Sequence, residues 1–278
     1  MEKETRTICY DTDLKIEAYR FAHIRQPFPN HFHGYYVLGI IAEGSRNMTV
    51  KNIDYCARAG DVIVFSPYQN HACLPDGNAA LSYYGLNVSS KIMEERCLEL
   101  TGKKFLPAFV SPLLQDEELY SYIYQLNQLI FEESKEFQKE ELFLCLIERL
   151  LRRHGFVQED DSQKDCANPS SIEKVCNYID ENFDRHISLN DLCDIACQSK
   201  STLLRTFTRE KGITPYRYLE TVRINKARQL LEDGLNPAEA ALNTGFSDQS
   251  HFNRYFTMFT GLTPALYRDI LQKKLTRK

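Results

Sequence analysis

Two stretches near the C-terminus of this 278-residue chain have almost the same sequence, 49 positions apart. Residues 205–218 read RTFTREKGITPYRY, and residues 254–267 read RYFTMFTGLTPALY. The positions that coincide include Arg205 with Arg254, Phe207 with Phe256, Thr208 with Thr257, Gly212 with Gly261, Thr214-Pro215 with Thr263-Pro264, and Tyr218 with Tyr267. Such a repeat indicates that one supersecondary unit occurs twice. The residues around it predict that the unit is a helix-turn-helix.

The first copy begins with a short helix that carries Leu189 and Leu192 on its inner face. Cys197 and Gln198 form the turn, and Ser199 caps a second helix whose inner face carries Leu203 and Phe207. The outer face of this second helix presents the candidate DNA-binding residues Lys200, Ser201, Leu204 and Arg205. A helix with short polar groups and an arginine facing outward can lie in the major groove and contact base edges. An exposed leucine there either meets a thymine methyl group or packs on the neighbouring helix.

The second copy places its first helix at residues 238–242 and its turn at residues 244–246. Ser247 or Asp248 then caps a helix anchored by three phenylalanines, Phe252, Phe256 and Phe259. The candidate DNA-binding residues on its outer face are Gln249, Ser250, His251, Asn253 and Arg254. Arginine suits guanine, and glutamine or asparagine suits adenine, through bidentate hydrogen bonds. An ordinary amphipathic helix would also show a polar face, but repetition of the whole motif favours DNA recognition.

The segment ALNTGFSDQSHFNRYFTMFTGLTPALYR resembles the signature of the AraC/XylS family of bacterial transcription regulators. Residues 187–231 resemble the preceding half of the same domain, and the resemblance covers about residues 171–270. It implies two helix-turn-helix units joined by a long helix at about Pro215–Leu231. Each unit would place one recognition helix in successive major-groove segments on the same side of the duplex. Cys197 departs from the pattern, because the family often has glycine at this turn.

The chain divides into an acidic part and a mildly basic part. Residues 1–169 hold 18 lysines and arginines against 25 acidic residues, whereas residues 170–278 hold 16 against 13. Residues 158–169, QEDDSQKDCANP, are polar and lack apolar periodicity, which is typical of a linker. We therefore expect a regulatory domain at residues 1–157 and a DNA-binding domain at residues 170–278.

The regulatory part changes character along its length. Residues 8–90 contain short Tyr-, Val-, Ile- and Phe-rich runs broken by turn signals, which predicts a β-sandwich or barrel. Residues 113–153 show apolar residues at helical spacing, interrupted near Ser134, which predicts a helical hairpin. The hairpin either packs on the barrel or pairs with a second subunit. The predicted fold class is α+β with two domains: a cupin-like β-barrel with a helical hairpin, then an all-α domain.

Residues 31–37 resemble the first strand motif of a cupin barrel, and residues 59–67 with His71 resemble the second. Strand alternation places His31, His33 and Tyr35 on one face, with His71 arriving from a later strand. The four side chains are candidate effector-binding residues, although three imidazoles could instead bind Zn, Fe or Mn, or be structural. The cupin metal motif also needs a glutamate where this chain has Val37 and Leu38. We therefore predict no metal and no cofactor.

In the AraC family such a barrel resembles a sensor for a sugar or a similar metabolite. We accordingly predict a bacterial transcription regulator, an activator, that binds promoter DNA as a homodimer and contacts RNA polymerase. The charged N-terminus shows no signal peptide, and no run reaches about 18 apolar residues, so we expect a cytoplasmic protein without a membrane span. The alternative is a cupin-type metal-dependent enzyme with a DNA-binding appendage. No catalytic Ser-His-Asp, P-loop or dinucleotide motif favours it, and we predict no catalytic residue.

Overall fold

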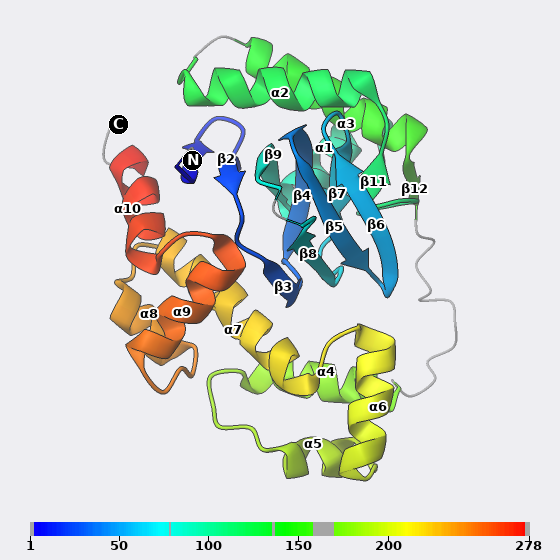
Figure 1. Cartoon of the computed structure of the whole chain (residues 1–278), viewed down its shortest axis with the longest axis vertical. Coiled ribbons are helices and arrows are strands. Elements are labelled where there is room, and N and C mark those ends of the chain that lie inside the picture. The colour runs from blue at the N-terminus through cyan, green and yellow to red at the C-terminus, as the bar shows by residue number, and fades with distance from the viewer. Residues whose placement is uncertain (1–2, 78, 135–136, 158–169, 276–278) are drawn as a thin grey trace. The chain divides into compact units, whose positions relative to one another are not determined.

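The computed structural model describes residues 3–77, 79–134, 137–157 and 170–275 (Figure 1). The predicted linker at residues 158–169 lies outside the described residues. The chain groups into two compact units. The first comprises residues 1–27, 33–69 and 73–160, and the second comprises residues 28–32, 70–72 and 161–278. Among the residues described, no helix combines the length and apolar character that crossing a bilayer requires.

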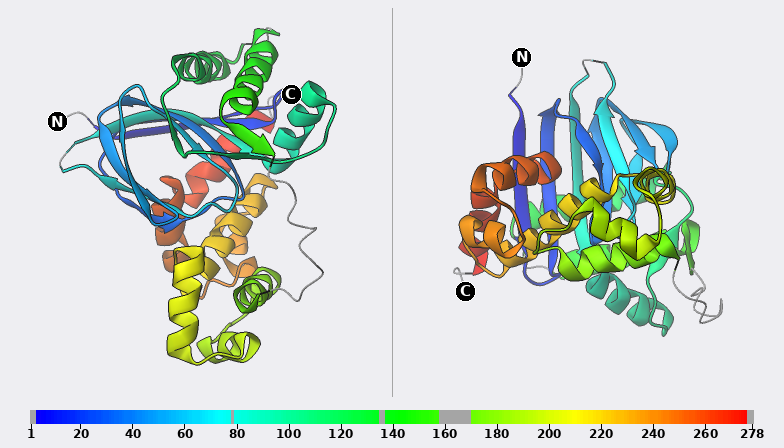
Figure 2. Two further views of the ribbon diagram at one scale, coloured as in Figure 1. Left: turned by 90° about the vertical axis from the view of Figure 1, so that its right-hand side faces the viewer. Right: turned by 90° about the horizontal axis from the view of Figure 1, so that it is seen from below.

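Antiparallel sheets dominate the N-terminal part of the chain (Figure 2). The largest has six strands in the order β1 (Thr5–Asp11), β2 (Ile16–Ile24), β9 (Leu81–Ser89), β4 (Tyr35–Glu43), β7 (Val62–Phe65) and β11 (Leu113–Leu114). A four-stranded sheet has the order β3 (Phe28–His31), β8 (His71–Pro75), β5 (Ser45–Val50) and β6 (Ile53–Arg58). A small third sheet pairs β10 (Pro107–Phe109) with β12 (Gly155–Val157). The strand-rich prediction for residues 8–90 is therefore confirmed.

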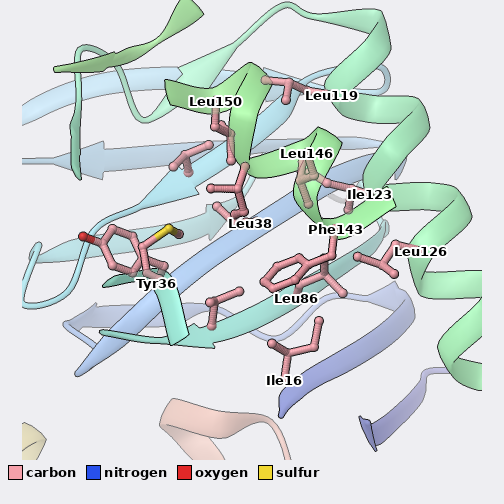
Figure 3. Packing of buried hydrophobic residues seen from close by; sticks show 14 of the residues in the cluster. Ile16, Tyr36, Leu38, Leu86, Leu119, Ile123, Leu126, Phe143, Leu146 and Leu150 are labelled. Atoms are coloured by element: carbon pink, nitrogen blue, oxygen red, sulfur yellow. The ribbon is translucent and has the colours of Figure 1, made fainter. Parts of the chain in front are cut away.

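Helices cover one face of the six-stranded sheet, where alternate strand residues meet the inner faces of α2 (Glu117–Phe131) and α3 (Gln138–Arg153) (Figure 3). This apolar core includes Ile16, Leu38 and Leu86 from the sheet and Ile123, Leu126, Phe143 and Leu146 from the helices. The predicted hairpin is thus confirmed, and its apolar face packs on its own sheet. That packing accounts for the helical periodicity without a second subunit.

Two details of the helical prediction need correction. The hairpin begins at Glu117 rather than at Leu113, because Leu113 and Leu114 pair with β7 and Asp116 caps the helix. A further helix, α1 (Ser90–Thr101), follows β9 directly and was not predicted. Its apolar periodicity is weak, since only Ile92, Met93 and Cys97 of its residues are buried.

The opposite face of the six-stranded sheet contains an aromatic side chain above two glycines. Gly39 on β4 and Gly85 on β9 lie directly opposite each other, and Tyr19 on β2 pairs with Gly85. A Cβ atom on Gly85 would lie only 2.3 Å from the Tyr19 hydroxyl oxygen. The two glycines therefore make room for the Tyr19 ring, which is 5% exposed.

The C-terminal part is helical, as predicted. Its helices are α4 (Ser171–Asn182), α5 (Leu189–Ala196), α6 (Lys200–Lys211), α7 (Pro215–Glu232), α8 (Pro237–Asn243), α9 (Gln249–Thr260) and α10 (Pro264–Leu275). Capping boxes begin three of them: Ser170 with Glu173, Ser188 with Asp191, and Asn236 with Glu239. Each cap satisfies orphan backbone N–H groups and typically contributes about 1 kcal/mol. The helix boundaries thus follow from signals that are local in the sequence.

Candidate nucleic-acid interface and effector site

The first helix-turn-helix consists of α5 and α6. The Ser188 hydroxyl accepts a hydrogen bond from the Asp191 N–H, and the Asp191 carboxylate accepts one from the Ser188 N–H. Cys197 ends α5 in the left-handed conformation, with φ of 51° and ψ of 43°. Ser199 then caps α6. The left-handed turn explains why a glycine suits this position in a helix-turn-helix.

Helix α6 has one buried and one exposed face. Leu203 and Phe207, the predicted anchors, are both 0% exposed. The opposite face exposes the four predicted DNA-binding residues, Lys200, Ser201, Leu204 and Arg205. Leu204 is 38% exposed, so part of its side chain is available to a ligand. The arrangement provides two cations and small polar groups on a helix that the unit's core holds in place.

The second helix-turn-helix consists of α8 and α9. Gly245 in its turn has a φ of +76°, and a Cβ atom there would lie 2.8 Å from the Asp184 carbonyl oxygen. Glycine is therefore required both by the backbone conformation and by the close approach of another segment. Asp248 caps α9 by accepting a hydrogen bond from the His251 N–H at 2.7 Å. The anchors are again buried, namely Phe252, Phe256 and Phe259.

The outer face of α9 exposes Gln249, Ser250, Asn253 and Arg254. His251 differs from these four, because its side chain is only 31% exposed. Its ring lies 4.5 Å from that of Tyr255, and its Nε2 lies 3.8 Å from a carboxylate oxygen of Glu220 on α7. His251 thus links α9 to α7 and has less surface free for a base than its neighbours.

Helix α7 lies between the two motifs and packs on both (Figure 1). Its Tyr218 ring contacts the Phe207 ring of α6 edge to face at 5.6 Å. Its Arg217 guanidinium lies 5.5 Å from the ring centres of Tyr255 and Phe259 on α9. Burial raises the pKa of Glu220, which pairs with Arg217 at 3.2 Å. These contacts hold α6 and α9 on one scaffold, in agreement with the two helix-turn-helix units joined by a long helix that the family resemblance implied.

The predicted effector-binding residues fall into two pairs. His31 and His71 are buried, with ring centres 4.5 Å apart, whereas His33 stacks on Tyr35 at 4.8 Å. His31 and His71 belong to the second compact unit and His33 to the first, so the convergence of the three imidazoles stays a prediction. His31 Nδ1 lies 2.6 Å from the Pro29 carbonyl oxygen. Burial lowers the pKa of His31 to about 4, so its imidazole is neutral at pH 7.

A cupin metal would require more than these imidazoles. The glutamate position of the motif holds Val37 and Leu38, which are buried apolar residues. Glu43 does not replace it, since its carboxylate accepts a hydrogen bond from Ser82 at 3.0 Å at the end of β4. The donor set therefore lacks the carboxylate of the cupin metal motif.

Comparison with known proteins places both parts of the chain in one family. Residues 13–148 match the family model of the AraC-like ligand binding domain, and residues 192–270 match that of a helix-turn-helix domain. An uncharacterized HTH-type transcriptional regulator, YbfI of Bacillus subtilis strain 168, is 43% identical over 277 residues and covers 100% of both chains. The chain belongs to the AraC family of transcriptional regulators.

Two further proteins are similar to this chain over most of its length. The HTH-type transcriptional activator RhaS of Escherichia coli O6:H1 is 26% identical over 262 residues, covering 88% of each chain. The crystal structure of unsaturated fatty acid-bound ToxT from Vibrio cholerae strain SCE256 superimposes with a TM-score of 0.55. That alignment covers 98% of this chain and 99% of ToxT at 16% identity, and so it shows the shared fold.

Sequence reasoning did not identify one prominent side chain of this AraC-family ligand-binding domain. Arg46 on β5 is 1% exposed, although arginines seldom lie so deep. Strand alternation places Arg46 on the same face as Met48 and Val50, and these three are the buried residues of the six-residue strand β5. The sequence alone does not show that the face they share is the buried one.

Proposed function

We propose that this AraC-family regulator binds promoter DNA with α6 and α9 as its two recognition helices. The observation that carries the proposal is the pair of exposed polar faces on helices whose opposite faces are anchored by buried phenylalanines. Arg205 and Arg254 occupy equivalent positions of the repeat and are both exposed. Each would make a bidentate contact to a guanine, worth about 1–3 kcal/mol of base discrimination.

We further propose the domain division expected from the sequence, with residues 1–157 as the sensor and residues 170–278 as the DNA-binding domain. The effector would be a small metabolite such as a sugar, and His31, His33, Tyr35 and His71 would contact it. ToxT, which shares the fold, has been solved with an unsaturated fatty acid, which supports a small-molecule role for the fold. Effector binding regulates DNA binding only if the effector has different affinities for two states of the protein.

The protein would act as a homodimer in the cytoplasm, activate transcription through RNA polymerase and catalyse no reaction. RhaS is named a transcriptional activator, which supports that direction of regulation. Since the apolar face of the α2–α3 hairpin is covered by the sheet, a dimer would use the hairpin's outward side. Tyr124 on α2 and Phe137 before α3 are exposed, at 42% and 78%.

A mobility-shift titration tests the DNA-binding proposal. The full chain is titrated against the DNA upstream of its own gene at two salt concentrations, with scrambled DNA of equal length as competitor and with a panel of sugars. We expect specific binding that one compound alters. Equal affinity for the upstream and scrambled DNA would contradict the proposal. Metal analysis of the purified protein tests the rival enzyme, which requires a stoichiometric metal ion.

A further inference from the structure

The guanidinium group of Arg46 is buried with most of its hydrogen-bonding capacity unused. Nη2 donates to the Ile24 carbonyl oxygen at 2.6 Å and lies 3.4 Å from that of Gln26. Neither Nε nor Nη1 meets an acceptor among the described residues, and both atoms are buried. One edge of the guanidinium is therefore anchored at the end of β2, and its other N–H groups have no protein acceptor there.

This arrangement is costly for the folded protein. A buried charge without a paired anion loses hydration, and each unsatisfied donor adds a further penalty. Burial accordingly lowers the pKa of Arg46 from its usual value, but a guanidinium remains protonated in proteins. Glu4 is the carboxylate that contributes to the potential at Arg46, yet it is exposed and already pairs with Arg6 at 3.0 Å. Among the residues that the structure describes, Arg46 therefore has no dedicated counter-charge.

The side chains that interact with Arg46 include an aromatic ring and a thiol. Tyr83 on β9 and Cys73 on β8 interact electrostatically with the guanidinium. The Tyr83 ring contacts the Phe21 ring at 5.3 Å and the Tyr19 ring at 5.4 Å. Burial raises the pKa of the Cys73 thiol to about 12, so the thiol is neutral at pH 7 and supplies no counter-charge. Arg46 thus interacts with Tyr83, which belongs to a cluster of three aromatic rings on the face of the six-stranded sheet opposite the helices.

We propose that this face binds an effector that carries an oxyanion, a carboxylate or a phosphate, on an apolar or aromatic body. The anion accepts charge-assisted hydrogen bonds from the unused Nη1 N–H groups of Arg46, since both carboxylate and phosphate oxygens pair strongly with a guanidinium. The body of the effector lies against Tyr19, Phe21 and Tyr83. This inference rests on the proposed function of the domain as a sensor of a small metabolite, and within that class it favours an anionic effector over a neutral sugar.

The test measures thermal stability and calorimetric Kd for the full chain with defined probes. The probes are sodium acetate, benzoate, hexanoate and phenyl phosphate; the neutral references are acetamide, benzamide and hexanamide, with sodium chloride matching ionic strength. We expect at least one anion to raise Tm by several degrees above its references, since a ligand that binds only the folded state stabilises it. A response to carboxylates identifies a carboxylic acid, and a response to phenyl phosphate alone identifies a phosphate ester.

Substitutions of Arg46 test whether this residue binds the responsive anion. Arg46→Gln removes the charge, and we expect it to weaken Kd for the responsive anion at least about tenfold. Arg46→Lys keeps the positive charge but replaces the planar guanidinium by an ammonium group. It provides a second variant if Arg46→Gln does not fold. Arg58→Gln changes the net charge equally at an exposed position of β6 and should leave Kd unchanged.

Two results overturn the inference. One is that no anion raises Tm above its references in the wild-type protein, and the other is an equal response in the Arg46 variants. Mobility shifts on the same preparations separate this failure from failure of the proposed function. Specific DNA binding without any anion response refutes only the oxyanion inference, whereas absence of specific DNA binding refutes the proposed function.

Discussion

Arg20 on β2 donates its Nε–H to the side-chain oxygen of Asn127 on α2 at 2.6 Å. Asn127 is fully buried, and its amide nitrogen also donates to the backbone carbonyls of Tyr19 and Gly85, at 3.1 and 3.2 Å. A single carboxamide thus joins the helical hairpin to two neighbouring strands. This polar contact helps to fix how the hairpin sits on the sheet.

Asn127→Ala should therefore destabilise the protein by about 2–3 kcal/mol, because it removes a charge-assisted hydrogen bond and two further bonds in a buried site. The measurement is urea unfolding at pH 7. Gln125→Ala, on the exposed side of the same helix, is the control and should change stability by less than about 0.5 kcal/mol. A loss no larger than that of the control would show that the bridge is dispensable.

The hydrogen bonds of Asp116 predict that the protein loses stability at acidic pH. Burial alone would raise its pKa, but hydrogen bonds from the Leu119 N–H, His154 and Arg149 lower the pKa to about 2. A carboxyl with a lowered folded-state pKa contributes stability above its unfolded pKa of about 4 and loses it as pH falls towards 2. This lowering of the Asp116 pKa corresponds to about 2 kcal/mol of the free energy of unfolding at pH 7.

Asp116→Asn should reduce stability at pH 7 by about that amount and flatten the stability profile between about pH 4 and pH 2. Urea unfolding across this range checks both. Asparagine still caps a helix, so the loss reports the charge and not the cap. Glu117→Gln provides a control at an exposed neighbouring carboxylate. An unchanged pH profile in Asp116→Asn would refute the assignment.

The helical domain was predictable from its sequence because its signals are local. Ser188, Asn236 and Asp248 mark helix starts by contacts within three residues, and the repeat located α6 and α9. The sheets depend on pairing between distant residues, such as Tyr19 with Gly85, which no single stretch of sequence encodes. The sequence therefore indicated strands but not their order.

The candidate sites were also only partly predictable from the sequence. The exposed residues of α6 and α9 follow from helical periodicity once the anchors are known. Arg46 was missed because an arginine on a strand is normally assigned to solvent, and its burial depends on where β5 sits in its sheet. The partial burial of His251 likewise depends on Tyr255 and Glu220, and only the latter is distant in sequence.

The turn of the first motif predicts an unusual stabilising substitution. Cys197 adopts the left-handed conformation, which costs a residue with a side chain about 1–2 kcal/mol. Cys197→Gly relieves this strain but gives the unfolded chain more freedom, so we expect a net gain of up to about 1 kcal/mol. Cys197→Val should destabilise the protein, because β-branched residues tolerate positive φ poorly. A lower urea midpoint for the glycine variant than for the wild type would argue against strain at this turn.

The two arginines of the repeat and Lys200 predict different DNA-binding phenotypes. Arg254→Ala and Arg205→Ala should each remove about 1–3 kcal/mol of discrimination at one base pair, at different positions of the operator. Lys200→Ala should weaken binding to all sequences and reduce the dependence of log K on log salt by about one. Arg152→Ala carries the same loss of charge on an exposed site of α3 and serves as the control.

The measurement is a set of competition titrations with operators changed one base pair at a time, each at two salt concentrations. Thermal unfolding of the same variants should show unchanged Tm, since these side chains are exposed. If Arg205→Ala and Arg254→Ala lost discrimination at the same base pair, the two helices could not occupy separate groove segments. If they lost affinity equally for all sequences, the arginines would contact phosphates and other residues of α6 and α9 would read the bases.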